Sequence, residues 1–230
     1  PLLLLLAIGL LLRNFILHRK KSLEEKNEDS LTKAESTSVQ GVIQESAATI
    51  ASVVKRGGKV YGVAIKGLAR QDLVLLKKNK KTIEKLSNEV DELRDNIFYF
   101  IKNLDDSSVT ASSFYINLLS YLQDMTQSLE FIVRATNKHV NNNHKKLKLG
   151  QIKELKEVEE ALLFVFENTQ SAFLSMEFEK IADILNNKEA FEIVSQKIQK
   201  QIERTRTEES SPKNTTLYFG LLLETKDLLT

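Results

Sequence analysis

The sequence predicts an all-α protein: an antiparallel six-helix bundle made of two tandem three-helix repeats and preceded by the end of a transmembrane helix. Three observations support this prediction. Only two prolines and eight glycines occur in 230 residues, which leaves long stretches without a helix breaker. Apolar residues recur at spacings of three and four along most of the chain. In addition, one helical stretch is repeated 103 residues further on.

The composition sets the class of protein. With 42% hydrophobic and 28% charged residues, the chain can bury a core of one or two compact units. The absence of cysteine excludes disulfides, iron–sulfur clusters and thiolate zinc sites. The net charge is only +2, so nothing in the overall charge indicates a nucleic-acid partner.

The first 21 residues, PLLLLLAIGLLLRNFILHRKK, place an apolar run before a basic cluster that ends at Lys21. A complete membrane span needs about 20 apolar residues, and a signal peptide would carry its positive charges first. We therefore expect residues 1–21 to be the last part of a transmembrane helix, with its basic flank on the cytoplasmic side. The alternative is a buried amphipathic helix or an interfacial anchor. Residues 22–38 are polar and are predicted to form a linker.

From residue 39 onward the pattern is helical, and residues 39–230 are predicted to form one helical domain. The first helix begins at Val39 and is expected to kink or pause at Gly57 and Gly58. Proline after Ser211 is typical of a helix start, because a first-turn N–H has no partner within the helix. The other predicted helices cover 70–104, 109–138, 151–174 and 178–206, and the sixth follows Ser211.

The repeat lays residues 107–124 over residues 210–227. Tyr115 then aligns with Tyr218, and Asp124 aligns with Asp227. The two stretches also share serine and threonine positions and an apolar face. The third and sixth helices are therefore predicted to be equivalent, with repeat one at about 39–140 and a truncated repeat two at about 147–230.

The segment HVNNNHKKL, residues 139–147, then falls at the junction between the two repeats. His139 and His144 are five residues apart, about 140° around a helix, so they do not share the face that binding one metal ion would need. Asparagines 141–143 favour a break in the helix. We interpret the segment as a joint, with a metal site as the alternative.

The segment KRGGKVYG, residues 55–62, is basic and contains three glycines. Its lysines and backbone amides could contact phosphate. It lacks the spacing of a P-loop and the strand before it, so a helix kink or an interhelix turn is the favoured interpretation.

Acidic residues give the main candidate metal site. Asp91 and Asp95 are four residues apart and lie on one helical face. Asp124 and Asp227 are equivalent in the repeat, and Glu224 lies three residues before Asp227. The alternative is a solvated acidic surface paired with nearby basic side chains. Motifs of nucleotide binding, zinc proteases, hydrolases and dinucleotide folds are absent from the sequence, so no catalytic residue is predicted.

Four stretches carry a resemblance to a known family: NEVDELRDNIFYFIKNLD, SFYINLLSYLQDMTQSLEFI, KHVNNNHKKL and RTEESSPKNTTLYF. Together they resemble the PhoU-like C-terminal domain of Pit-type inorganic phosphate transporters of the Bacteroidetes kind, over about residues 40–230. The resemblance implies two three-helix repeats, and residues 1–21 would be the final span of the transporter.

Several proteins of the PhoU-like family, which this chain resembles, carry iron or zinc clusters on repeated E/DxxxD motifs. Asp91 and Asp95 fit this motif, whereas Asp124 is followed by Ser128 and Glu224 lies one residue too close to Asp227. An iron or zinc cluster is therefore implied by the resemblance and only partly matched by the residues.

The resemblance further implies a non-enzymatic, cytoplasmic domain that regulates phosphate uptake at the bacterial inner membrane. Its expected partners are the transmembrane transport domain of the same chain, the inorganic phosphate that this domain handles and the membrane, but no nucleic acid; homo-oligomerisation is left open. Two alternatives remain: a structural support domain of a sodium- or proton-coupled symporter, and a metal-binding helical enzyme.

Overall fold

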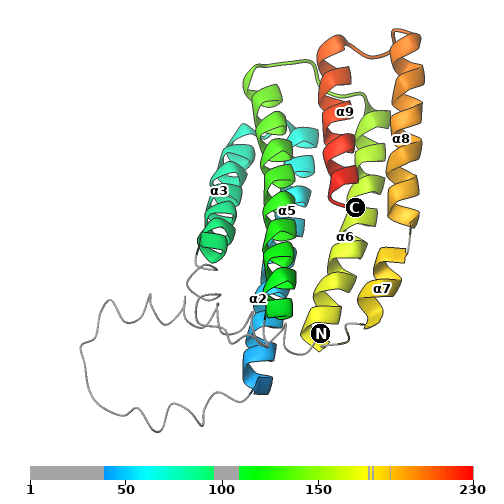
Figure 1. Cartoon of the computed structure of the whole chain (residues 1–230). Helices are drawn as coiled ribbons and strands as arrows, with labels where there is room; N and C mark the ends of the chain where they lie inside the picture. The colour runs from blue at the N-terminus through cyan, green and yellow to red at the C-terminus, as the bar shows by residue number, and fades with distance from the viewer. Residues whose placement is uncertain (1–38, 96–108, 176, 178, 187, 230) are drawn as a thin grey trace.

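The computed structural model describes residues 39–230, apart from 96–108, 176, 178, 187 and 230. The predicted membrane helix and linker, residues 1–21 and 22–38, lie outside this part of the chain. All elements of the described part are helices, as predicted (Figure 1). Among the described residues, no helix is long and apolar enough to cross a membrane.

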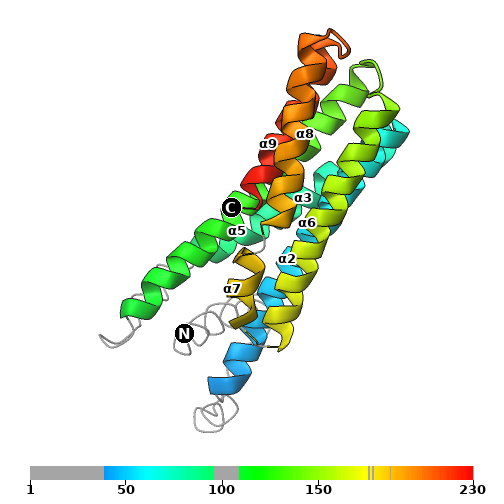
Figure 2. The same ribbon diagram turned by 90° about the vertical axis from the view of Figure 1, so that its right-hand side faces the viewer.

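The described helices run antiparallel to one another along one bundle, except that two successive helices of the second half, covering residues 179–186 and 189–206, run in the same direction (Figures 1 and 2). The prediction of a helical bundle is therefore confirmed. The helices of the first half are α2 (Val39–Arg70), α3 (Leu73–Asp95) and α5 (Val109–Asn141), and those of the second half are α6 (Leu149–Ser175), α7 (Glu179–Asn186), α8 (Glu189–Arg206) and α9 (Pro212–Asp227).

Helix α2 continues through Gly57 and Gly58, so the predicted pause or interhelix turn at this point is wrong. The chain turns instead at Gln71, which has a positive φ of 56°. The Asp72 side chain then accepts a hydrogen bond from the Leu75 amide at 2.9 Å and caps α3. The second helix consequently begins at Leu73, three residues later than predicted.

The predicted helix at 178–206 is divided into two helices: α7 ends at Asn186, and α8 begins at Glu189 (Figure 2). Asparagines 186 and 187 are poor helix formers, because their side chains compete for backbone hydrogen bonds. Glu189 and Glu192 in the first turn of α8 favour a new helix start, since carboxylates stabilise a helix N-terminus.

Helix α9 begins as the sequence predicts. Pro212 occupies its first position, and the Ser211 hydroxyl accepts a hydrogen bond from the Asn214 amide at 3.3 Å. The Asn214 side chain in turn donates to the Lys146 carbonyl at 3.0 Å. The start of α9 is therefore tied to the segment that joins α5 to α6.

That joining segment contains HVNNNHKKL. Helix α5 ends at Asn141, and Asn143 adopts a positive φ of 53°. Nε2 of His139 lies 2.9 Å from the Lys145 carbonyl oxygen, while the His139 and His144 rings meet edge to face at 5.2 Å. The segment thus forms a joint between helices, as interpreted from the sequence.

Packing follows a simple pattern in which α3 lies against α2 and α5, while α8 lies against α6 and α9. The two halves meet through α2 with α6 and through α5 with α9 (Figures 1 and 2). Ile83, Leu86 and Val90, which follow one another at spacings of three and four along α3, are buried. Buried residues from both halves form one continuous core.

Candidate functional site

Four basic residues follow one face of α2: Lys55, Lys59, Lys66 and Arg70. At 100° per residue they fall within an arc of about 60°, and at 1.5 Å per residue they extend over about 22 Å. All four are exposed. They form a stripe of positive charge along the helix, which we call the basic stripe.

Helix α6 packs beside this stripe because two glycines leave room for it. A Cβ atom at Gly58 would lie 3.0 Å from Cδ2 of Leu163, and one at Gly62 would lie 2.9 Å from Oε1 of Glu159. Lower-numbered residues of α2 thus face higher-numbered residues of α6, so the two helices are antiparallel. The glycines serve close helix packing and do not break the helix.

A groove of about 570 Å³ lies between α2 and α6. Its size falls within the range of about 300–1,000 Å³ that is usual for sites that bind small ligands. The basic stripe lines it from α2 and Lys156 adds a fifth cation from α6; the other charged residues in the lining are Glu159 and Glu167, and its apolar residues include Val54, Val63, Leu163 and Phe166.

The groove has an excess of positive charge. Five cations face two carboxylates, and none of the five takes part in the ion pairs formed by the described residues. Burial raises the pKa of Glu159, although Lys156 opposes this shift. The Glu159 carboxyl therefore gains a proton more readily than an ordinary glutamate, and the groove favours an anionic ligand.

The amides of residues 55–62 lie within α2 and are occupied by the hydrogen bonds of the helix itself. Contact of phosphate with this segment, the less favoured interpretation of the sequence, can therefore involve its side chains only. Lys55 and Lys59 line the groove, whereas Arg56 points to α3 and pairs with Glu89 at 2.7 Å.

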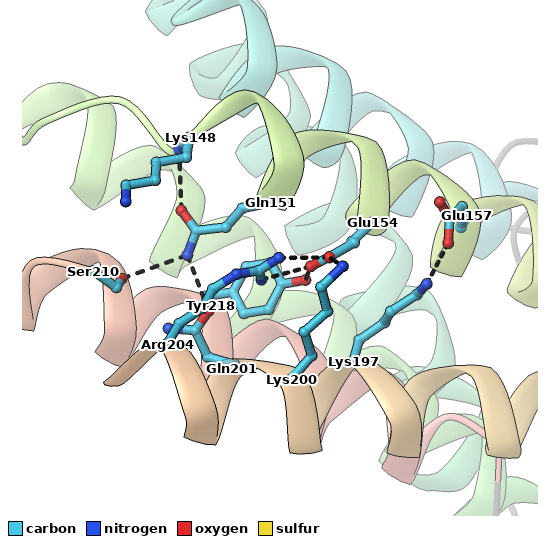
Figure 3. A network of polar contacts seen from close by, with 10 residues as sticks. All are labelled: Lys148, Gln151, Glu154, Glu157, Lys197, Lys200, Gln201, Arg204, Ser210 and Tyr218. Carbon is cyan, nitrogen blue, oxygen red and sulfur yellow. Dashed lines mark hydrogen bonds and ion pairs between the residues drawn. The ribbon is translucent and has the colours of Figure 1, made fainter. Parts of the chain in front are cut away.

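A second charged cluster surrounds Glu154 on the side of α6 that faces α8 and α9 (Figure 3). The two Glu154 oxygens accept hydrogen bonds from Arg204 at 2.7 and 2.6 Å. Lys200 forms an ion pair with Glu154 at 2.6 Å, and the Tyr218 hydroxyl donates to it at 2.6 Å. Glu154 is buried, with only 4% of its surface exposed. We call this cluster the Glu154 clamp.

The clamp binds helices to one another and leaves no carboxylate oxygen for a ligand. Burial by itself raises the Glu154 pKa, but the hydrogen bonds from Arg204, Lys200 and Tyr218 outweigh it and lower the pKa to about 2. Beside it, the Gln151 amide donates to Gln201 at 3.1 Å (Figure 3). The cluster joins α6, α8 and α9.

The structure places the five predicted metal ligands on three helices. Asp91 of α3 accepts a hydrogen bond from Gln123 at 3.0 Å, and Asp95 pairs with Arg94 at 3.0 Å. Asp124 of α5 and Asp227 of α9 are exposed. Glu224 is half-buried on α9, one turn before Asp227.

In the described part of the chain, no three carboxylate or imidazole groups lie where they could hold a metal ion. The structure therefore does not bring the five carboxylates together into a cluster. Binding of iron or zinc by Asp91, Asp95, Asp124, Glu224 and Asp227 stays a prediction.

The sequence interpretation identified only part of the groove. The spacings of four, seven and four residues between the cations of the basic stripe are a helical signal that could have been found. Lys156 and Glu159 carry no such signal, because only folding brings α6 against α2. The same holds for the Glu154 clamp, whose partners come from three helices.

Searches against protein-family models, curated proteins and solved structures found no match for this chain.

Proposed function

We propose that this chain is the regulatory part of a bacterial inorganic phosphate transporter. In this proposal residues 1–21 end the last membrane span, and the helical domain at 39–230 lies on the cytoplasmic side, where it modulates uptake. The proposal starts from the resemblance of four sequence stretches to the PhoU-like domain of Pit-type transporters.

The repeated packing pattern is the observation that carries the proposal. Helix α3 lies against α2 and α5, as α8 lies against α6 and α9, and the halves meet through α2 with α6 and α5 with α9. Two tandem three-helix repeats would produce this pattern, with α7 and α8 together as the middle helix of the second repeat.

The 103-residue register supports the same arrangement. Leu119 and Leu222 are both buried, with 6% and 0% of their surfaces exposed. Asp124 and Asp227, five residues further on in each copy, are both exposed. A duplicated helix accounts for the agreement in these inward and outward positions.

The proposed mechanism is a change in how the bundle packs against the membrane part of the transporter. A ligand that binds one arrangement better than another shifts the population between them, and it needs no catalytic residue. The groove between α2 and α6 offers exposed charge for such a ligand, while the Glu154 clamp joins α6, α8 and α9 of the second half.

The test removes residues 39–230 from the full transporter in cells and measures uptake of radiolabelled phosphate after growth on scarce or abundant phosphate. We expect uptake to continue and its response to phosphate supply to disappear. Immunoblotting of membranes checks that equal amounts of transporter are present. An unchanged response would contradict regulation, whereas complete loss of uptake at normal membrane abundance would favour the role of a structural support.

A further inference from the structure

From the basic stripe and the groove beside it, we infer that the face between α2 and α6 binds a linear polyphosphate chain, either free or as part of a nucleotide. This inference goes beyond the regulatory proposal, because it names the class of ligand. It can be tested separately, since binding can be measured without a transporter. It rests on the spacing of the cations, on the concave shape of the site and on the excess of positive charge.

The spacing of the cations matches a long, thin anion. Lys55, Lys59, Lys66 and Arg70 share an arc of about 60° over about 22 Å of α2. A single phosphate ion could meet only one end of this stripe. A phosphate chain carries charge along its whole length, so each added phosphate reaches a further cation and releases further counterions.

The end of the groove nearest the C-terminus of α2 is the most basic. Gly62 faces Glu159, so one turn further on Lys66 of α2 lies level with Lys156 of antiparallel α6. Arg70 follows one turn later. These three cations converge from two helices onto one end of the groove, and lysine and arginine side chains are the usual partners of phosphate oxygens.

The shape of the site distinguishes this ligand from a flat anionic membrane. The cations line the walls of a groove of about 570 Å³ whose lining also includes Gly58 and Gly62. A flat bilayer could touch the exposed ends of these cations but could not follow the concave surface between the two helices.

The experiment uses the whole chain and isothermal titration calorimetry with inorganic phosphate, tripolyphosphate, ATP and long-chain polyphosphate. We expect affinity to increase with the number of linked phosphates and to fall as salt is added, because binding releases counterions. Tighter binding of ATP than of tripolyphosphate would identify a nucleotide, and equal or weaker binding of ATP would identify the free chain. Equal affinity for inorganic phosphate and long-chain polyphosphate would overturn the inference.

Charge variants locate the site. The double variant Lys59→Gln/Lys66→Gln should weaken binding of long-chain polyphosphate by roughly tenfold or more. The matched control Lys77→Gln/Lys81→Gln removes the same charge from exposed positions on α3 outside the groove, and it should bind as the unchanged chain does. Equal losses in both double variants would mean that only net charge matters, which would overturn the inference.

A neutral variant separates shape from charge. A Cβ atom at Gly62 would lie 2.9 Å from Oε1 of Glu159, so Gly62→Leu pushes the Glu159 side chain into the groove without altering any charge. We expect it to weaken polyphosphate binding while the helical circular dichroism spectrum is preserved. Unchanged binding would place the ligand outside the groove.

Polyglutamate serves as the competing anion. If polyglutamate binds as tightly as polyphosphate, the inference is overturned in favour of an acidic peptide.

Discussion

The Glu154 carboxylate joins three helices of the second half of the bundle. It receives the bidentate Arg204 guanidinium, Lys200 and the Tyr218 hydroxyl within 2.7 Å. The Arg204 side chain is only 14% exposed. If the carboxylate were lost, water could therefore hardly replace it as the partner of the guanidinium charge. A buried cation that loses its partner is strongly destabilising.

We predict that Glu154→Gln lowers the free energy of unfolding by about 3 kcal/mol, because it leaves Arg204 buried without a counter-charge. Urea denaturation followed by circular dichroism measures the change. Glu157→Gln is the matched control on the same helix, since Glu157 pairs with Lys197 but its side chain is 55% exposed. Its cost should stay below about 1 kcal/mol. Similar costs for both variants would contradict the structural role of the clamp.

Glu154 also gives the protein an acid-sensitive component of stability. Burial by itself raises the pKa of Glu154, but the hydrogen bonds from Arg204, Lys200 and Tyr218 outweigh burial. The pKa consequently falls from 4.5 to about 2. The unfolded chain therefore binds more protons than the folded chain between these values. The stabilisation from Glu154 is complete above the unfolded pKa and disappears as the pH falls through the folded one.

The resulting prediction concerns the difference in stability between the unchanged chain and Glu154→Gln. This difference should be constant from neutral pH to about pH 5 and should shrink by about pH 3, because the Glu154 carboxyl of the unfolded chain takes up a proton below pH 4.5, whereas that of the folded chain stays charged down to about pH 2. Urea midpoints at several pH values measure it. A difference that is independent of pH down to about pH 3 would show that the carboxylate charge does not stabilise the fold.

At the scale of the helices, the glycines of α2 differ in what surrounds them. A Cβ atom at Gly67 would lie 2.6 Å from Cδ2 and 2.7 Å from Cγ of Leu76, a side chain that is fully buried. At Gly62 the near atom is Oε1 of Glu159, at 2.9 Å, the far end of a flexible side chain. Core packing therefore requires glycine at position 67, whereas at position 62 the neighbouring Glu159 side chain can move.

We predict opposite effects of alanine at these two positions. Gly67→Ala should destabilise the protein by about 1–3 kcal/mol, because Leu76 has no free space into which to move. Gly62→Ala should raise stability by about 0.5–1 kcal/mol, since alanine is the better helix former and Glu159 can shift. Thermal unfolding of both variants checks the signs. Destabilisation by Gly62→Ala would mean that the carboxylate of Glu159 is held in place.

The helices show where sequence patterns suffice and where they do not. Apolar residues at spacings of three and four predicted the helix that contains α3, and the Ser211 cap with Pro212 predicted the start of α9, because both signals are local. Gly57 and Gly58 were misread as a pause, since only the packed structure shows that Leu129 and Leu163 approach them. The cations of the basic stripe also follow a local period, but the groove requires α6.

At the scale of the whole molecule, the two halves are joined by a buried hydrogen bond as well as by a shared core. Tyr61 of α2 and Thr225 of α9 are fully buried, and their hydroxyl oxygens are 2.8 Å apart. The Thr225 oxygen also lies 2.6 Å from the Leu221 carbonyl. Since Thr225 has one hydroxyl proton and the carbonyl can only accept, Thr225 donates to Leu221 and Tyr61 donates to Thr225.

This assignment predicts unequal costs for removing the two partners. Tyr61→Phe deletes the donor and leaves Thr225 bonded to Leu221, so the free energy of unfolding should fall by about 1 kcal/mol. Thr225→Val leaves the Tyr61 hydroxyl buried without its partner and should cost more, about 2–3 kcal/mol. Urea denaturation compares them.

Thr216→Val is the matched control for Thr225→Val, because the Thr216 hydroxyl also bonds to a carbonyl within α9, that of Pro212, but at an exposed position. It should change stability by less than about 0.5 kcal/mol. Because buried residues of both halves form one core, each variant should still unfold in a single transition with a lower midpoint. A Thr225→Val protein in which one half melts before the other would show instead that this bond, more than the shared core, couples the two halves.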